Sequence, residues 1–476
     1  MAVDARTLVK NFAGFSVAPV VAAIVSFVVV PIVTNVFPED EYGKINLFCS
    51  TGTLVMGFCL LGLDNSLARY YLEPPAGVRK EGIQWLALVC GSVVCCVSCA
   101  VVCAVPVLRE KVCTLIFGER DVGLIVCLAV FVFALVVMRL VNIDARMRED
   151  YRSYNTQYIL QTVFTKVSFV VVALAWSTDH ECSIAMMTAC MVVLAAFHLL
   201  RRRRAFSPSG TTFTRRSLWT LVSFGVPYMM TSLVVNLNAT IGKFALSSAG
   251  LFDEAGVFAI AVTLANAFTV FSQAFCIYWS PFMYKNYRTN QHAIIQMHDL
   301  VMFGTLVIVV LFVCFQDVLF VIVGGSYSRC QPYFMLVMLS PIQGLVCETT
   351  SYGIPIKARP IYNVVASVAG LAVSAAVSFT LVEPLGAFGA AIGVAASSVV
   401  ICLIRSAIGQ VLYKSVDSPL RSLASGGVIV GMCAANVVLF AMPLARMAVC
   451  AVVLAAAAVA YRRQIAKAVR ALARRR

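Results

Sequence analysis

The sequence predicts an all-α polytopic membrane protein, with about fourteen transmembrane helices in two six-helix lobes and a C-terminal helix pair. Composition is the first indication: 61% of the 476 residues are hydrophobic and 12% are charged, whereas soluble proteins carry about 25% charged residues. The second indication is that apolar runs of about 20 residues, the length that crosses about 30 Å of hydrocarbon, recur along the chain. The third is that basic residues gather in every second loop.

The predicted spans are the apolar runs between charged breaks, and residues 27–75 show their pattern most clearly. Two long apolar segments flank the acidic turn at residues 37–43, and the carboxylates of such a turn have no partners in hydrocarbon. The turn is therefore expected outside the bilayer core. The spans cover residues 12–36, 47–71, 82–107, 122–144, 156–177, 183–200, 218–247, 255–280, 299–323, 332–355, 361–382, 386–412, 424–442 and 444–461.

The distribution of basic residues orients the chain. Of the 37 Lys and Arg residues, Arg139, Lys166 and Lys243 lie well inside spans, and a residue near a span end is counted with the adjacent side. Six residues then belong to one side, which leaves 28 on the other side. Because positively charged loops stay in the cytoplasm, both termini are expected there. The net charge of +15 is thus interpreted as a topology signal rather than as a sign of nucleic-acid binding. The six residues on the outer side are Lys44, Arg109, Lys111, Arg120, Arg329 and Arg446.

An Arg-rich segment with the composition of a flexible linker divides the chain at residues 201–217. A weak internal repeat supports this division, because Glu41-Tyr42-Gly43 recurs as Glu254-Ala255-Gly256. An even number of helices per lobe makes the repeat parallel, with a pseudo-twofold axis along the membrane normal. The predicted segments are an N-terminal lobe (1–200), a cytoplasmic linker (201–217), a C-terminal lobe (218–413), an additional helix pair (414–461) and a basic cytoplasmic tail (462–476).

The prolines, the tryptophans and the C-terminal tail of the chain allow three further predictions. Pro19 and Pro227 lie within spans, where each removes a backbone hydrogen bond and can bend the helix. In a two-lobe transporter they would act as gates, and a static kink that serves packing is the alternative. Trp279, like the other tryptophans, lies near a span end and is interpreted as an interfacial anchor. The tail at residues 462–476 is expected to lie along the anionic inner leaflet.

The sequence gives no support for catalysis. No nucleotide-binding glycine loop, metal-ligand cluster or nucleophile–base pair stands out, and histidine occurs four times. We therefore expect no enzyme activity, no cofactor and no metal site. Most of the 18 cysteines fall within apolar runs, where a thiol is a small protonated packing group.

The candidate functional residues are ionisable side chains inside the spans. Such groups are costly to insert, and they mark either a pathway or a pair that faces the protein interior. Lys166 lies too deep in its span to reach the membrane surface easily. For cations nearer to span ends, extension of the side chain to the surface is the alternative. The predicted substrate-binding cations are Arg69, Arg139, Lys166 and Lys243.

Asp64 and Glu348 are the two candidate buried carboxylates. Each has two interpretations, and both follow from the cost of a charge inside the membrane. A carboxylate can bind a coupling proton or Na⁺, or it can neutralise a nearby arginine or lysine. We favour the neutralising role for both.

A set of residues near the beginning of the chain points to a known family; the set is Pro31, Thr34, Pro38, Glu41-Tyr42-Gly43, Leu61-Gly62-Leu63 and Arg69-Tyr70-Tyr71. In these residues the chain resembles the Wzx-type oligosaccharide flippases, polysaccharide biosynthesis proteins of the MATE-like MOP exporter superfamily. The resemblance implies a multi-pass protein of the bacterial cytoplasmic membrane with two lobes that alternate in access. At Gly242-Lys243, where the family often carries an Asp-Arg pair, this chain keeps the cation and lacks the acid, which puts any ion-coupling role of that acid in doubt.

These observations lead to the hypothesis of a flippase that moves an undecaprenyl-pyrophosphate-linked oligosaccharide from the inner to the outer face by alternating access. The pyrophosphate requires cations in a cavity shielded from lipid. The alternatives are a MATE-type multidrug exporter coupled to H⁺ or Na⁺, whose cavity would favour carboxylates, and a lipid II flippase. A membrane-embedded glycan polymerase or ligase is disfavoured because the outer loops are short. The expected partners are the lipid-linked substrate, membrane lipids and a coupling H⁺ or Na⁺, without nucleic acid.

Overall fold

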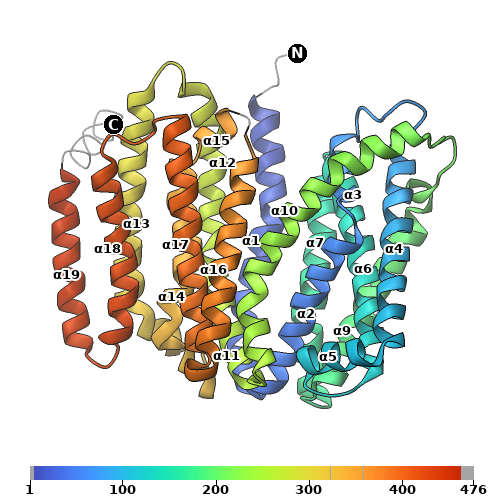
Figure 1. Ribbon diagram of the computed structural model, residues 1–476, viewed down its shortest axis with the longest axis horizontal. Coiled ribbons are helices and arrows are strands. Elements are labelled where there is room, and N and C mark those ends of the chain that lie inside the picture. Colours follow the sequence, from blue (N-terminus) through green and yellow to red (C-terminus); the bar gives the residue numbers. More distant parts are fainter. Residues whose placement is uncertain (1–4, 322, 358, 463–476) are drawn as a thin grey trace. The chain divides into compact units, whose positions relative to one another are not determined.

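The computed structural model describes residues 5–321, 323–357 and 359–462, and within these ranges it is built from helices without strands (Figure 1). Among the described residues, twelve helical segments are long and apolar enough to cross a membrane, and the number is thirteen if the bent pair of α2 (Glu39–Cys59) and α3 (Leu63–Arg69) is one span. The predicted all-α polytopic membrane fold is therefore confirmed, with a span count close to the expected fourteen. The predicted basic tail lies outside the described residues except for Arg462.

The chain forms two compact units, and the first comprises Met1–Ala259. A further helix, α11 (Phe252–Ala267), extends across the boundary. The division differs in position from the lobe boundaries expected from the sequence, which remain a prediction. The helices of the first unit are α1 (Ala5–Val36), α2, α3, α4 (Lys80–Ala104), α5 (Pro106–Phe117), α6 (Val122–Met147), α7 (Tyr151–Lys166), α8 (Ser168–Ala175), α9 (His180–Arg201), the 3-10 helix η1 (Arg203–Phe206) and α10 (Arg215–Ser248).

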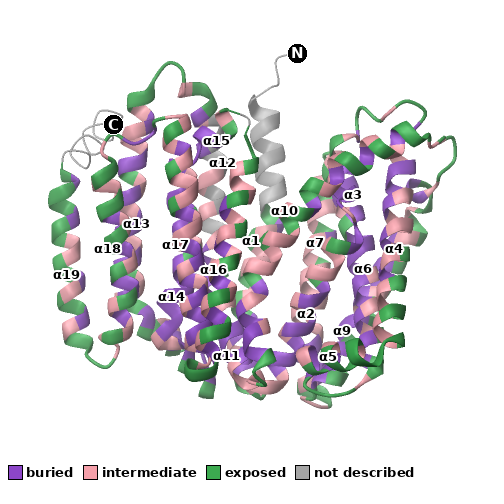
Figure 2. Cartoon of the chain, in the orientation of Figure 1, coloured by how far each residue is buried: buried purple, intermediate pink, exposed green. Residues whose placement is uncertain are grey.

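Helix α6 is the buried centre of the first unit (Figure 2). Its start is fixed by Asp121, whose carboxylate accepts a hydrogen bond from the Gly123 backbone N–H at 2.7 Å. It packs against α2, α4 and α9. The rings of Phe131 in α6 and Phe48 in α2 lie 5.0 Å apart, within the range of favourable aromatic contacts. The apolar side chains of α6 thus hold the surrounding helices in fixed positions.

The second predicted span, residues 47–71, is broken rather than continuous. Helices α2 and α3 meet at an angle of 62°, and the break contains Gly62 with a φ of 72°. A Cβ atom at Gly62 would lie 2.0 Å from the backbone oxygen of Gly225 in α10. The chain therefore needs glycine at position 62 for two reasons, the left-handed backbone and the close approach of α10.

Two other predicted spans are also interrupted. The span expected at 156–177 consists of α7 and α8, which are separated at Val167. The span expected at 255–280 is divided between α11 and α12 (Thr269–Asn286), and neither is by itself a candidate membrane span. Hydropathy averages over a window, so it does not reveal a break of one or two residues.

The second unit comprises Ile260–Arg476, with α14 as its most buried helix. Trp279 of α12 is fully buried and packs with Met283, Ile294 and Tyr352, so the expectation that Trp279 is an interfacial anchor is wrong. Its Nε1–H donates to the Glu348 backbone oxygen at 2.9 Å, which satisfies the polar end of the ring. The helices are α12, α13 (Gln291–Val321), the 3-10 helix η2 (Gly325–Cys330), α14 (Gln331–Thr350), α15 (Gly353–Ile356), α16 (Ile361–Leu385), α17 (Ala387–Leu412), α18 (Pro419–Val438) and α19 (Pro443–Ala460).

Candidate functional site

Arg139 in α6 and Asp64 in α3 form an ion pair in the first unit. Both Nε and Nη2 of Arg139 donate to Asp64 Oδ2, at 3.0 and 2.9 Å. The Asp64 side chain is 9% exposed, whereas that of Arg139 is 44% exposed. The other oxygen of Asp64 accepts a hydrogen bond from the amide of Asn65 at 3.0 Å. This geometry favours the charge-neutralising role for Asp64 and leaves much of the Arg139 guanidinium accessible.

Lys243 in α10 is buried against α2. Its Nζ donates to Asn46 Oδ1 at 2.7 Å and to Ser50 Oγ at 2.9 Å. Lys166, at the end of α7, is the other lysine predicted inside a span. Within the described part of the chain, no carboxylate lies within 4.0 Å of either ammonium group.

Lys166 is the last residue of α7, and its side chain is half-buried. The break at Val167 ends the helix directly after it. One turn and a half earlier on α7, Gln161 accepts a hydrogen bond from the Asn142 amide of α6 at 3.1 Å. Polar side chains of α2, α6, α7 and α10 thus accompany the two lysines. Lys166 and Lys243 both lie in helices of the first unit, and their joint role as a cationic site remains a prediction. We refer to these two residues as the lysine pair.

Arg69 lies apart from this group. It is exposed at the end of α3, with Nη1 3.8 Å from Glu73 Oε2, and its guanidinium lies 5.4 Å from the ring centre of Tyr70. Among the described residues, no contact joins Arg69 to the other predicted cations. This placement favours the surface interpretation of Arg69, with its charge in water or among headgroups.

Glu348, the second predicted carboxylate, belongs to α14 in the second unit. Its Oε1 lies 4.0 Å from Nη2 of Arg405 in α17, and both side chains are about two-thirds to three-quarters buried. An arginine thus faces each of the two predicted carboxylates, Asp64 and Glu348. The geometry favours neutralisation at both positions.

The predicted gating prolines lie inside long continuous helices. Pro19 is within α1 and Pro227 is within α10. Pro227 follows closely after Gly225, whose backbone contacts Gly62. Neither helix is interrupted at its proline, so their role as gates remains a prediction.

A network around Asp144 is not evident from the sequence, in which Asp144 is the last residue of the span predicted at residues 122–144. Its carboxylate is almost fully buried and accepts three hydrogen bonds. The donors are the Tyr71 hydroxyl at 2.7 Å, Arg148 Nε at 3.0 Å and Arg202 Nη1 at 3.1 Å. They come from the turn after α3, the end of α6 and the end of α9. One carboxylate therefore joins three helix ends of the first unit.

The Asp144 network predicts a pH dependence through Tyr71, which lies beyond the end of α3. Burial and the hydrogen bond to Asp144 raise the pKa of Tyr71 from 10.0 to about 12, against the opposing effect of Arg148. A raised pKa in the folded state stabilises the protein below the unfolded pKa, and this stabilisation is lost as the pH rises through the folded pKa.

We therefore expect Tyr71→Phe to lose less stability than the wild type between pH 10 and about 12, as measured by thermal unfolding in detergent. The matched control is Tyr284→Phe, because Tyr284 is exposed and its removal should leave the pH profile of the wild type unchanged. Identical profiles for Tyr71→Phe and the wild type would contradict the prediction.

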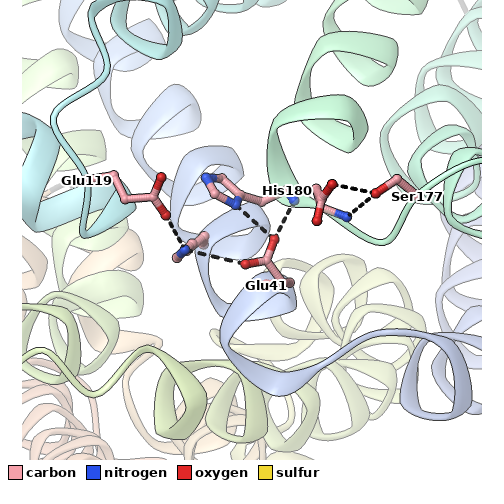
Figure 3. A network of polar contacts seen from close by, with 6 residues as sticks. Glu41, Glu119, Ser177 and His180 are labelled. Carbon is pink, nitrogen blue, oxygen red and sulfur yellow. Dashed lines mark hydrogen bonds and ion pairs between the residues drawn. The ribbon is translucent and has the colours of Figure 1, made fainter.

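A second polar network joins three other helix ends of the first unit (Figure 3). His180 at the start of α9 places its Nδ1 2.8 Å from Glu41 Oε2 in α2. Lys44 lies between two carboxylates, with its Nζ 2.7 Å from Glu119 and 3.4 Å from Glu41. Local spacing in the sequence does not reveal this group, because its members lie far apart along the chain.

The second unit contains an apolar cavity of about 580 Å³ between α13, α14, α17 and α18. Its walls include Met302, Val346, Leu403 and Val430, with glycines on α18 that leave space beside the helix. His298 also lines it, but both ring nitrogens of His298 are hydrogen-bonded, to Thr349 and Ser422 in the same unit. The cavity therefore suits an apolar guest rather than a charged one.

Comparison with known proteins agrees with this architecture. The solved structure of the lipid II flippase MurJ in an inward closed conformation has a TM-score of 0.68 at 11% identity, covering 95% of this chain and 99% of that chain. An inward-facing multidrug resistance MATE family transporter of the MOP superfamily has a TM-score of 0.55 at 13% identity, covering 86% and 96%. At these identities the likeness shows a shared fold.

The sequence comparisons identify the family. No curated protein matches the chain by sequence. The family model described as polysaccharide biosynthesis protein matches residues 8–287, which is more than half of the chain. The protein therefore belongs to the polysaccharide biosynthesis protein family, and it shares its fold with these solved structures.

Proposed function

We propose that this protein is a flippase for an undecaprenyl-pyrophosphate-linked oligosaccharide, which it moves from the inner to the outer face of the bacterial cytoplasmic membrane. Both termini are placed in the cytoplasm by the excess of basic residues on one side. The headgroup would cross through the protein while the prenyl tail stays among lipids. No bond is made or broken in this process, and H⁺ or Na⁺ is the candidate source of energy.

The lysine pair is the observation that carries this proposal. Lys243 is buried in α10 and Lys166 is half-buried at the end of α7, and they lack a carboxylate partner in the described residues. Such an arrangement is costly unless an anion joins it for part of the cycle. A pyrophosphate offers several anionic oxygens and forms short, charge-assisted hydrogen bonds with lysine. The half-exposed guanidinium of Arg139 adds a third donor group on α6.

The apolar cavity of the second unit supports a substrate with a long hydrocarbon part. Burial of apolar surface is favourable by about 25 cal/mol per Å², so a cavity lined mainly by apolar side chains can hold part of a prenyl chain while the rest of the chain stays among lipids. The walls contain no free charged group that would oppose this. A lipid-linked anion combines both requirements, an anionic headgroup and an apolar tail.

The alternatives differ in the charge that they require. A multidrug exporter of cations needs accessible carboxylates, whereas Asp64 and Glu348 both face arginines. A lipid II flippase fits as well, since lipid II also carries a pyrophosphate, and the fold similarity to MurJ favours it as the second candidate.

Deletion of the gene tests the proposal. We expect lipid-linked oligosaccharide units to accumulate on the inner face of the membrane, as measured by mass spectrometry of extracted lipids and by the accessibility of the glycan to an external probe. Accumulation of lipid II in place of the oligosaccharide would assign the second candidate. Normal levels and normal sidedness of both lipids would refute a flippase function.

A further inference from the structure

Glu119, His180 and Glu181 form a group with the geometry of a metal site. Each offers one ligand atom, and these atoms all lie within 4.8 Å of one another. His180 and Glu181 begin α9, and Glu119 lies in the loop between α5 and α6. The imidazole is buried whereas both carboxylates are exposed, so an ion from solution can reach the group.

The orientation of His180 points to a ligand. Its Nδ1 lies 2.8 Å from Glu41 Oε2, and its backbone N–H donates to the same oxygen. Because a carboxylate accepts, Nδ1 carries a proton, and in the neutral imidazole Nε2 then presents a lone pair. Figure 3 shows the ring between Glu41 and Glu119. His180 is 4% exposed, and its Nε2 has no hydrogen-bond partner within the described residues. Buried polar atoms without a partner are rare in folded proteins.

Glu41 and His180 are arranged as in metal sites where a carboxylate that does not bind the ion holds a histidine ligand in place. Glu119 and Glu181 are the carboxylates on the ligand side. Histidines that bind metals almost always donate their other ring N–H to a carboxylate, a carbonyl or water. Here the hydrogen bond from His180 Nδ1 to Glu41 fixes the ring so that Nε2 points away from Glu41. Glu41 is thus placed to act as the positioning residue of the site.

The net charge of the group balances that of a divalent cation. Glu41, Glu119 and Glu181 carry three negative charges, and Lys44 offsets one of them through its contacts with Glu41 and Glu119. With a neutral imidazole, two negative charges remain. Lys44 contacts Oε1 of Glu119, so the second oxygen of that carboxylate is available to an ion.

We propose that Glu119, His180 and Glu181 bind a divalent transition-metal ion, with Zn²⁺ as the ion that the ligand set fits best. Zn²⁺ binds imidazole nitrogen and carboxylate oxygen at about 2.0–2.2 Å and commonly retains a water molecule beside three protein ligands. Bound there, the ion joins the start of α9 to the α5–α6 loop and, through Glu41, to α2. The site is independent of the lysine pair and of the proposed substrate.

The test is metal binding by the purified full-length protein in lipid nanodiscs. We expect calorimetry to show one Zn²⁺ per chain, with affinity at least tenfold lower in Glu119→Gln and in Glu181→Gln. Loss of a carboxylate that supports a ligand lowers metal affinity about 10- to 100-fold, so Glu41→Gln should weaken binding similarly. Glu110→Gln, which removes an exposed carboxylate outside the group, should bind as the wild type does.

The 18 cysteines are free thiols and are competing ligands. The absorption spectrum of bound Co²⁺ distinguishes the proposed site from a cysteine site. An ion ligated by nitrogen and oxygen gives d–d bands without a thiolate charge-transfer band. Cys182→Ser, which removes an exposed thiol close to His180, should leave this spectrum unchanged. Unfolding of each variant without metal shows whether it is folded. The proposal is overturned if the wild type binds no ion, if Glu119→Gln and Glu181→Gln both bind normally, or if the Co²⁺ spectrum is that of a thiolate site.

Discussion

Lys166→Ala is expected to reduce export of the lipid-linked oligosaccharide at least tenfold while protein levels in the membrane stay normal. A hydrogen bond to a charged group is worth about 1.5–3 kcal/mol, and about 1.4 kcal/mol corresponds to a factor of ten. Lys166 has no carboxylate partner within the described structure, so its removal leaves no buried acid uncompensated. Transport of fluorescent lipid-linked oligosaccharide in reconstituted vesicles measures the effect.

Two variants serve as controls for Lys166→Ala. Lys166→Arg keeps the positive charge and should retain more export than the alanine variant. Lys357→Ala removes an exposed lysine from the second unit and should transport as the wild type does. Full export by Lys166→Ala would remove Lys166 from the substrate path, although the family assignment would stand.

Gly62→Ala is expected to prevent correct assembly of the first unit. The left-handed backbone costs about 1–2 kcal/mol for a residue with a Cβ atom. The Cβ atom introduced at position 62 would also lie 2.0 Å from the Gly225 backbone oxygen. Such overpacking commonly lowers the free energy of unfolding by another ~1–3 kcal/mol. Since backbone atoms cannot rotate away, α3 and α10 must separate. The expected result is a strong loss of folded protein, measured by size-exclusion chromatography and thermal unfolding.

Two other glycines separate the two costs. Gly250 has a φ of 75° and no atom within 4 Å of a built Cβ, so Gly250→Ala should show the backbone cost alone. Gly225→Ala places a Cβ 2.8 Å from the Gly62 oxygen in an ordinary helical conformation and should show the packing cost alone. If Gly62→Ala were no less stable than Gly250→Ala, the close contact between α3 and α10 would be refuted.

The sequence predicts the fold well because the signal for a membrane span is local and repeated. The length and the apolar composition of each run are enough to place α4, α6, α9 and α17 within a few residues. Breaks depend instead on single residues such as Gly62 and on the helix that packs beside them. Trp279 was misassigned for the same reason, since its burial depends on residues up to about seventy positions away.

The candidate site was predicted only in part. Lys166 and Lys243 stand out because a charge inside an apolar run is visible in the sequence itself. Arg139, the partner of Asp64, is separated from it by 75 positions in the sequence. Glu41 and His180 are separated by 139 positions. Such pairs form only when helices pack, so no local pattern indicates them.

The broken helix at Gly62 also has a consequence for biosynthesis. The backbone N–H groups of Leu60, Leu61 and Leu63 keep local hydrogen bonds at this break, so what the break requires from the rest of the chain is a packing partner. Helix α10 closes against this break, with Ser66 donating to the Leu221 carbonyl across 155 positions of chain. During translation the ribosome must therefore deliver that later segment before the early hairpin reaches its final form. Until then, α3 lacks the helix against which it packs in the folded protein.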